Sequence, residues 1–143
     1  KTAEDARAFL CMETEMLCNP FLMRDVEPAI DRLLAAVRSH EKITIYGDYD
    51  VDGVTSVSIL YLYLSALGGK VRYYIPDRLS EGYGVNVDAI RRLSGEGIGL
   101  MITVDTGITA NEETEYAAKC GIETVITDHH ECREELPEAA AVV

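Results

Sequence analysis

The sequence is poor in basic residues and has no long apolar run. Its 143 residues include 13 Lys and Arg against 25 Asp and Glu, for a net charge of −12. This balance argues against a nucleic-acid binder that depends on a broad basic face. The sequence contains no run of about 18 apolar residues, the length needed to span a membrane. No basic-then-apolar signal peptide opens the chain. We therefore expect a cytoplasmic protein with no membrane partner.

Cysteine pairs at metal-binding or redox spacing are also missing. The four cysteines, Cys11, Cys18, Cys120 and Cys132, include no C-x-x-C pair, which disfavours a zinc knuckle or a dithiol redox motif. We expect reduced thiols that mostly fill the core. The sequence also has no internal repeat and no low-complexity segment, and its length suits about one domain.

Two regions differ in their periodicity. Residues 1–41 predict a helical lead-in, with helices over 2–17 and 26–39. From residue 42 onward, short apolar segments alternate with helical ones. The predicted strands are 42–46, 70–75, 99–104, 123–126 and 139–143. The predicted helices between them are 54–67, 86–94 and 109–120.

This alternation predicts an α/β fold. Strands that alternate with helices of about ten residues form right-handed βαβ units and a parallel sheet. We expect about five parallel strands flanked by helices, with extra helices at the N-terminus. The apolar helix that begins near Val54 is expected to pack on most of its faces. Thr109 to Glu112 has capping-box spacing. The chain stops inside the fifth predicted strand, so we expect region 42–143 to be a domain truncated at its C-terminus.

The loop after the first predicted strand is rich in carboxylates. Asp48, Asp50 and Asp52 lie within five residues, where a strand passes into a helix. Three negative charges this close repel one another, and a bound cation would relieve that repulsion. Carboxylate oxygens suit Mg²⁺ and Mn²⁺. The alternative is a solvated acidic turn beside a helix N-terminus.

Further metal-ligating residues follow two other predicted strands. Asp105 follows the third strand directly, and Asp128, His129 and His130 follow the fourth. Because parallel strands point the same way, all of these side chains should meet at the carboxyl edge of the sheet, where such sheets bind ligands. Together with the first loop they offer the ligand types of a dinuclear hydrolytic site. The alternatives are that Asp105 caps a turn and that the histidines lie on a surface loop.

These segments resemble the first three motifs of the DHH phosphoesterase superfamily. They are Asp-Tyr-Asp-Val-Asp-Gly at 48–53, Val-Asp-Thr-Gly at 104–107 and Asp-His-His at 128–130. The segments 45–56 and 76–84 are similar to its RecJ branch, the single-strand-specific exonucleases. Branches that act on small substrates usually carry a histidine where this chain has Tyr46. The resemblance extends over residues 19–143.

The resemblance implies a metal-dependent phosphodiester hydrolase that degrades single-stranded DNA from the 5′ end in recombination and repair. Two Mn²⁺ or Mg²⁺ ions would activate a water molecule. Transferred to this sequence, Asp50 and Asp52 would be direct ligands, Asp105 would bridge the metals and His129 would complete one of them. Asp48 would be a ligand or a supporting acid.

The same resemblance implies roles around the reacting phosphate. Asp128 would orient the histidine next to it. His130 would contact the scissile phosphate or assist the leaving oxygen. Arg78 would bind phosphate through its planar guanidinium, unless it forms a salt bridge with Glu81 in its own loop. A fourth acidic motif and a second DNA-gripping domain of the family are not found in residues 1–143. We therefore expect the isolated piece to bind metal weakly and to have little activity.

Other functions compete with this interpretation. A DHH-type phosphatase or oligonucleotidase would act on small phosphoesters. A haloacid-dehalogenase-type phosphatase would use Asp50 as nucleophile and Asp52 as acid and base. A receiver-like signalling domain would be phosphorylated on Asp105. The sequence does not decide between Mn²⁺ and Mg²⁺, and it leaves the oligomeric state open.

Overall fold

Five parallel strands form one sheet in the computed structural model, which describes residues 2–11 and 17–143. The spatial order of the strands is β2-β1-β3-β4-β5. Their bounds are β1 Lys42–Gly47, β2 Lys70–Tyr74, β3 Leu100–Val104, β4 Glu123–Thr127 and β5 Ala141–Val142. The predicted α/β fold is confirmed, and every predicted strand is present.

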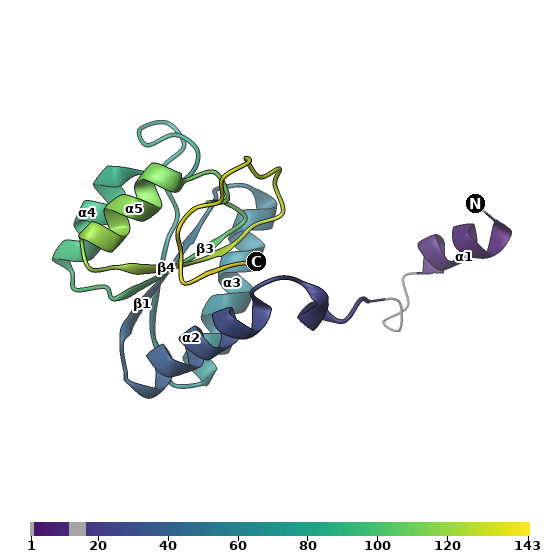
Figure 1. The fold of residues 1–143 in the computed structure, drawn as a ribbon, viewed down its shortest axis with the longest axis horizontal. Helices are drawn as coiled ribbons and strands as arrows, with labels where there is room; N and C mark the ends of the chain where they lie inside the picture. Colours follow the sequence, from purple (N-terminus) through teal and green to yellow (C-terminus); the bar gives the residue numbers. More distant parts are fainter. Residues whose placement is uncertain (1, 12–16) are drawn as a thin grey trace.

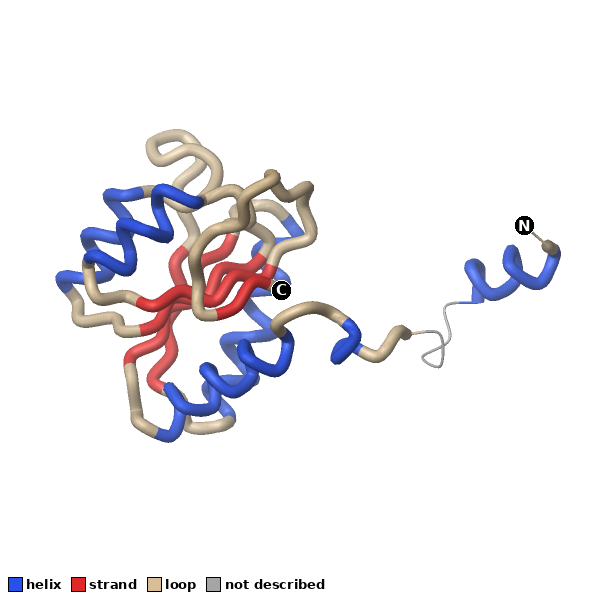
Figure 2. The backbone as a smooth tube through the Cα atoms, viewed as in Figure 1, coloured by secondary structure: helices blue, strands red, loops and turns tan. Residues whose placement is uncertain are grey.

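Helices cover both faces of this sheet. Their bounds are α1 Ala3–Cys11, α2 Val26–Arg38, α3 Val51–Ala66, α4 Val87–Gly95 and α5 Asn111–Lys119, with a short 3-10 helix, η2, at Pro20–Leu22. Figures 1 and 2 show α2 and α3 against one face and α4 and α5 against the other. The helix predicted over 2–17 is seen as α1, and residues 12–16 of that prediction lie outside the described residues. No described helix has both the length and the apolar character needed to cross a membrane.

Each face of the sheet has its own hydrophobic core. On one face, side chains of α2 and α3 such as Ala36 and Leu64 pack on Ile43, Ile45 and Ile102 of the central strands. On the other face, Tyr46 and Met101 pack against α4 and α5. The central strands β1 and β3 are buried on both sides, which explains why their sequences are nearly continuous apolar runs.

Helix α3 differs from its prediction, since only one of its sides is buried. Gly53, Val57 and Leu64 face the sheet, while Ile59 and Leu62 are 71% and 68% exposed. The expectation that this helix packs on most of its faces is therefore wrong. A helix that lies on a sheet buries one stripe, and the described chain places no second layer on the other side of α3.

Two smaller expectations also fail. Three cysteines, Cys11, Cys18 and Cys132, are exposed and therefore do not fill the core, whereas half-buried Cys120 packs against the core on the α4–α5 face. The capping box at residues 109–112 does not form, because the N-cap of α5 is Ala110 and it makes no side-chain cap. The backbone of Thr109 precedes the cap position, so its hydroxyl is one residue too early to serve the helix.

Candidate metal centre

The junction between β1 and α3 sets the positions of the first acidic residues. Asp50 is the N-cap of α3, and its Oδ1 accepts a hydrogen bond of 3.0 Å from the backbone N–H of Gly53. This cap starts the helix at Val51, three residues earlier than predicted, and places Asp52 in its first turn. A Cβ at Gly53 would lie 2.5 Å from the carbonyl oxygen of Asp48, so glycine is required for this close approach.

Three aspartates meet at the carboxyl edge of the sheet. Asp48, Asp50 and Asp105 each present a carboxylate oxygen within 4.8 Å of the other two. Asp48 is 2% exposed, and its Oδ1 accepts the N–H of Tyr49 at 2.7 Å. Two loops, one after β1 and one after β3, therefore bring their acids together as the sequence predicted.

Asp105 is held in an unusual backbone conformation. Its φ of 58° lies in the left-handed region, and its backbone N–H donates to the carbonyl of Thr127 at 3.1 Å. Asp tolerates this region better than most residues because its short polar side chain bonds locally. The turn aims the carboxylate of Asp105 at the neighbouring loop. Burial and the nearby charge of Asp50 raise the pKa of Asp105 above its ordinary value.

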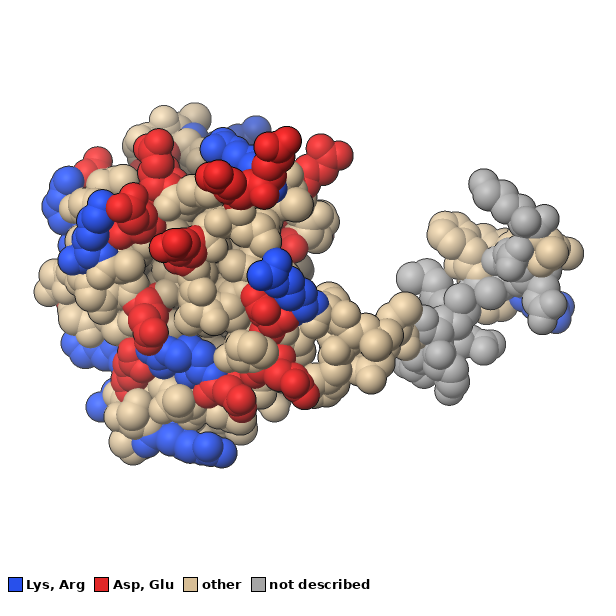
Figure 3. Space-filling view, viewed as in Figure 1, with Lys and Arg blue, Asp and Glu red and all other residues tan. Residues whose placement is uncertain are grey.

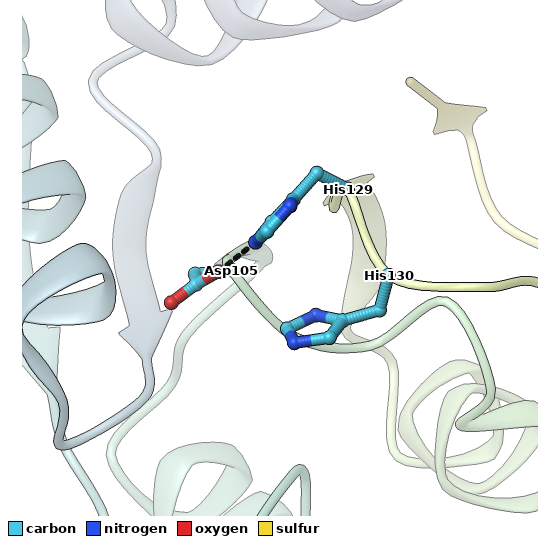
Figure 4. Close-up of side chains that lie close together, drawn as sticks. All are labelled: Asp105, His129 and His130. Atoms are coloured by element: carbon cyan, nitrogen blue, oxygen red, sulfur yellow. Dashed lines mark hydrogen bonds and ion pairs between the residues drawn. The ribbon is translucent and has the colours of Figure 1, made fainter.

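Two histidines complete the cluster. His129 Nε2 lies 2.9 Å from Asp105 Oδ1, the contact drawn as a dashed line in Figure 4. His130 lies beside it, and the two rings are 4.6 Å apart between centroids. Nitrogen atoms of both histidines are within 4.8 Å of a carboxylate oxygen of Asp105. Asp105 is thus shared by the acidic group and by the imidazole group.

Asp128 holds His130, whereas the sequence suggested that it orients its immediate neighbour His129. Its Oδ1 lies 2.7 Å from His130 Nδ1, and its Oδ2 accepts the N–H of Ile108 at 3.0 Å. Burial alone would raise the pKa of Asp128, but these hydrogen bonds lower it below its ordinary value. In turn, the hydrogen bond to Asp128 raises the pKa of His130. The carboxylate therefore fixes the ring through Nδ1, and Nε2 lies 3.5 Å from the hydroxyl of Tyr83.

Asp52 stands apart from both groups. It is exposed in the first turn of α3, where it lines a cleft of about 420 Å³ together with Thr55, Asp105 and His129. Of the acids in the first loop, Asp48 and Asp50 join the cluster and Asp52 forms the wall beside it. The sequence alone had favoured Asp52 over Asp48 as a direct ligand.

Within the described chain, the acidic cluster has a histidine beside it but no paired lysine or arginine. Across residues 2–11 and 17–143, no Lys or Arg forms an ion pair with Asp48, Asp50 or Asp105. On the face drawn in Figure 3, basic side chains lie in small groups mixed with acidic ones. The hydrogen bond from Gly53 keeps the pKa of Asp50 below its ordinary value, so this side chain is charged at neutral pH. The three carboxylates offer the oxygen ligands that a hard divalent cation prefers.

Arg78 lies beside the site, and it forms no ion pair with a carboxylate of the described residues. Its guanidinium carbon is 5.2 Å from the ring centroid of Tyr49, in the loop that carries Asp48 and Asp50. The alternative salt bridge with Glu81 is not present, because Glu81 bonds to Arg92 instead.

Sequence reasoning missed two aromatic residues at this edge. The ring of Tyr83 forms T-shaped contacts with the rings of Tyr49 and His130. The distances between ring centroids are 6.4 Å to Tyr49 and 6.2 Å to His130. Tyr83 Oη lies 3.5 Å from His130 Nε2. The glycines on either side of Tyr83, at 82 and 84, were the available signal that this loop bends back toward the strand ends.

Solved structures of similar proteins share this arrangement of strands and helices. A RecJ exonuclease bound to manganese matches with a TM-score of 0.79 and 38% identity, covering 84% of this chain and 31% of that one. RecJ of Thermus thermophilus in complex with Mn²⁺ matches with a TM-score of 0.67 and 33% identity, covering 80% of this chain and 16% of that one.

Sequence relatives and a family model agree with the structural matches. The single-stranded-DNA-specific exonuclease RecJ of Bacillus subtilis is 48% identical over 142 residues, which are 99% of this chain and 18% of that protein. RecJ of Escherichia coli is 35% identical over 119 residues, or 82% of this chain and 21% of that protein. The chain thus spans about a fifth of the length of these relatives. The model of the DHH family, N-terminal domain, matches residues 42–143, and the chain belongs to the DHH family.

Proposed function

We propose that the protein is a metal-dependent nuclease that degrades single-stranded DNA from its 5′ end, in the cytoplasm and in recombination and repair. The observation that carries this proposal is the cluster of Asp48, Asp50 and Asp105 next to two histidines, in which no lysine or arginine of the described residues pairs with the acids. Its support is the membership in the DHH family together with relatives that are single-stranded-DNA-specific exonucleases.

The residues at the site fit a pair of hard divalent ions. Mn²⁺ and Mg²⁺ prefer carboxylate oxygens and Mn²⁺ also accepts imidazole, which are the groups gathered here. Asp48, Asp50, Asp105 and His129 would hold the ions, and Asp52 would contact one of them through the cleft wall. Bound there, the ions would lower the pKa of a water molecule and place positive charge against the phosphodiester.

The remaining residues act on the substrate itself. Arg78 offers a planar fork that matches two oxygens of a phosphate. His130 contacts the scissile phosphate through Nε2, because Asp128 fixes its Nδ1. As the imidazolium that its raised pKa favours, His130 can give a proton to the leaving oxygen. Asp128 stays ionised and keeps the ring oriented.

The test is a cleavage assay on the protein at the full length of its coding sequence. Oligonucleotides labelled at the 5′ or the 3′ end, single-stranded or in duplex, are incubated with Mn²⁺, with Mg²⁺ or with a chelator. We expect metal-dependent release of nucleotides from the 5′ end of single strands, and loss of that activity in Asp50→Asn and His129→Ala. Asp88→Asn, which changes an exposed acid of α4, is the matched control and should behave as the parent. Equal cleavage by all variants, or cleavage that persists in chelator, would refute the proposal.

The same assay separates the competing functions. Small phosphoesters and trinucleotides are offered in parallel with long single strands. Faster turnover of the small substrates would favour a phosphatase or an oligonucleotidase of the same family. The isolated 143-residue chain is measured alongside, and we expect weak Mn²⁺ binding and little cleavage.

A further inference from the structure

The loop at residues 75–86, between β2 and α4, is folded on itself. Asp77 Oδ1 accepts the backbone N–H groups of Leu79 at 3.0 Å and Ser80 at 2.9 Å. In return, Glu81 Oε2 accepts the N–H of Asp77 at 2.8 Å. This reciprocal pattern closes a single turn in the same way that a capping box closes the start of a helix. Arg78 lies inside that turn.

A three-residue cluster ties this turn to the body of the domain. Glu81 Oε1 accepts the hydroxyl of Tyr74, at the end of β2, at 2.5 Å, and it also bonds to the guanidinium of Arg92 in α4. The same guanidinium contacts the hydroxyl of Tyr74 and lies over its ring, 5.4 Å from the centroid. We call Tyr74, Glu81 and Arg92 the clamp.

The clamp has a single protonation state at neutral pH. The hydrogen bond from Tyr74 and the N–H of Asp77 lower the pKa of Glu81 below its ordinary value. Burial and the hydrogen bond to Glu81 raise the pKa of Tyr74 to about 12. Glu81 is therefore a carboxylate, Tyr74 a neutral phenol and Arg92 a cation.

A second anchor holds the far end of the same loop. The fully buried hydroxyl of Tyr46 donates to the carbonyl of Gly84 at 3.0 Å and accepts from Asn86 Nδ2 at 3.1 Å. Tyr46 is in β1, two residues before Asp48, and its ring lies on the opposite face of the sheet from α3. The strand that delivers the acids also fastens the 75–86 loop.

The clamp determines what the loop offers to the site. Glu81 and Arg78 lie in the same turn, but they do not pair, because the Glu81 carboxylate already bonds to Arg92 and Tyr74. Arg78 instead rests over Tyr49, next to Asp48 and Asp50. A guanidinium that pairs with no carboxylate of the described residues, placed beside the proposed hydrolytic site, is ready to bind a phosphate.

We propose that the clamp is a positioning device that keeps Arg78 free and aimed at the phosphate of the nucleic-acid strand. Glu81, Arg92 and Tyr74 do not touch the substrate, and they act through Arg78. The inference rests on the proposed function, in which Arg78 binds that phosphate. Removal of Arg92 would release Glu81 to pair with Arg78 within the turn, which would withdraw the guanidinium from the substrate.

The experiment is a double-mutant cycle between Arg92 and Arg78 in the full-length enzyme with Mn²⁺. We expect Arg92→Met to raise KM for single-stranded DNA by about 10- to 100-fold, the range that misplacement of a positioned group costs, with a much smaller change in kcat. Arg92→Lys should recover part of the loss. In an Arg78→Ala background, Arg92→Met should add less than about twofold, because coupled residues are not additive. Equal fold-changes in both backgrounds would overturn the proposal.

A matched control and a second variant keep the result interpretable. Arg91→Met changes the adjacent arginine, which pairs with exposed Asp88, and should leave KM unchanged. Mn²⁺ affinity, measured by titration, should be the same in Arg92→Met and the parent, whereas general unfolding of the site would weaken it. If Arg92→Met does not fold, Tyr74→Phe takes its place in the double-mutant cycle, because that variant also disrupts the clamp by removing one hydroxyl.

The outcomes also separate this inference from the proposed function. Metal-dependent cleavage that survives in Arg78→Ala with unchanged KM overturns the clamp proposal and leaves the nuclease assignment standing. Undiminished cleavage in Asp50→Asn refutes the nuclease site itself, whatever the clamp variants do.

Discussion

At the amino end of the sheet Arg32 of α2 bonds to Glu41 and Glu123, whereas at the carboxyl end Asp48, Asp50 and Asp105 meet without an arginine or a lysine from the described chain. Arg32 reaches Glu41 with two hydrogen bonds of 2.8 Å and Glu123 with one of 2.6 Å. Both ends of the same sheet gather acidic side chains. Among the described residues, Arg32 pairs with the acids at the amino end, whereas the three aspartates at the carboxyl end have a histidine beside them but no paired lysine or arginine.

This difference distinguishes acids that are paired within the fold from acids that are available to a ligand. A paired acid is an ordinary structural group, and loss of its partner changes stability. A buried acid beside like charges is costly to keep, so its presence indicates a task that requires it. We therefore expect a cation from solution to stabilise the carboxyl end and to have no effect on the amino end.

The largest effect is expected when a carboxylate of the unbalanced end is removed. Asp105→Asn should lower cleavage of single-stranded DNA by more than about 100-fold. Loss of a group that only supports a metal ligand costs up to about 100-fold, and loss of a direct ligand should cost more. Asparagine tolerates the left-handed backbone of Asp105, so the fold should persist. Without divalent ions the variant should unfold at a higher temperature than the parent, because the repulsion with Asp50 is gone. Activity and Tm are measured on the same sample.

The matched control for this variant is Asp25→Asn. Asp25 also has a left-handed backbone, with a φ of 57°, but it lies at the start of α2. Its substitution should leave cleavage at the level of the parent. A similar loss of activity in both variants would mean that backbone disturbance, not the carboxylate, explains the result.

A smaller effect is expected when the acids stay but their spacing changes. Gly53→Ala would place a methyl group 2.5 Å from the carbonyl oxygen of Asp48 and would push α3 away from the end of β1. We expect Mn²⁺ affinity to fall at least about tenfold and stability to fall by about 1–3 kcal/mol, as for other overpacked sites. Calorimetric titration and urea unfolding measure the two quantities.

Gly95→Ala provides the comparison for that substitution. A Cβ at Gly95, in the last turn of α4, meets open space. The change should leave Mn²⁺ affinity unchanged and should raise stability slightly, because alanine favours the helix. Equal loss of metal binding in both glycine variants would contradict the role given to the β1–α3 junction.

The balanced end of the sheet should respond in stability alone. Arg32→Met removes the partner of half-buried Glu41 and should lower the free energy of unfolding by about 2 kcal/mol, the range for hydrogen bonds to charged groups. Cleavage by the folded enzyme and its Mn²⁺ affinity should not change. Loss of metal binding at unchanged stability would erase the distinction between the two ends.

The smallest effect is expected inside the sheet, between the two ends. Among the described residues, Thr124 of β4 has a buried hydroxyl with no hydrogen-bond partner. Thr124→Val should therefore raise the free energy of unfolding by about 1 kcal/mol. Thr127 Oγ1 donates to the carbonyl of Thr103 at 2.8 Å, so Thr127→Val should instead lower it. Urea unfolding of both variants tests the opposite signs.

The sequence was sufficient to predict the alternation of strands and helices and the edge at which the acids meet. Buried strands such as β3 are continuous apolar runs, and the ends of parallel strands share one edge whatever the details of the loops. This geometry made the approach of Asp48, Asp50 and Asp105 predictable before any side chain was placed.

The pairing of individual side chains was not predictable in the same way. Asp128 bonds to His130 and not to its neighbour, and Glu81 bonds to Arg92 and not to Arg78. These choices depend on the path that each loop takes and, for Glu81, on a partner in a different element of the chain. Similarly, the early start of α3 depends on the cap by Asp50, which moved Asp52 into the helix.

The backbone of Asp105 limits how this family member can change through evolution. Glutamate has the same charge, but it lacks the short side chain that makes a left-handed residue tolerable, at a cost of about 1–2 kcal/mol. The substitution that looks conservative is therefore the one that strains the turn, and the uncharged asparagine is the one that folding does not oppose. We expect a relative with asparagine at this position to fold without strain but to lose the proposed metal ligand, while one with glutamate would need compensating changes in the turn.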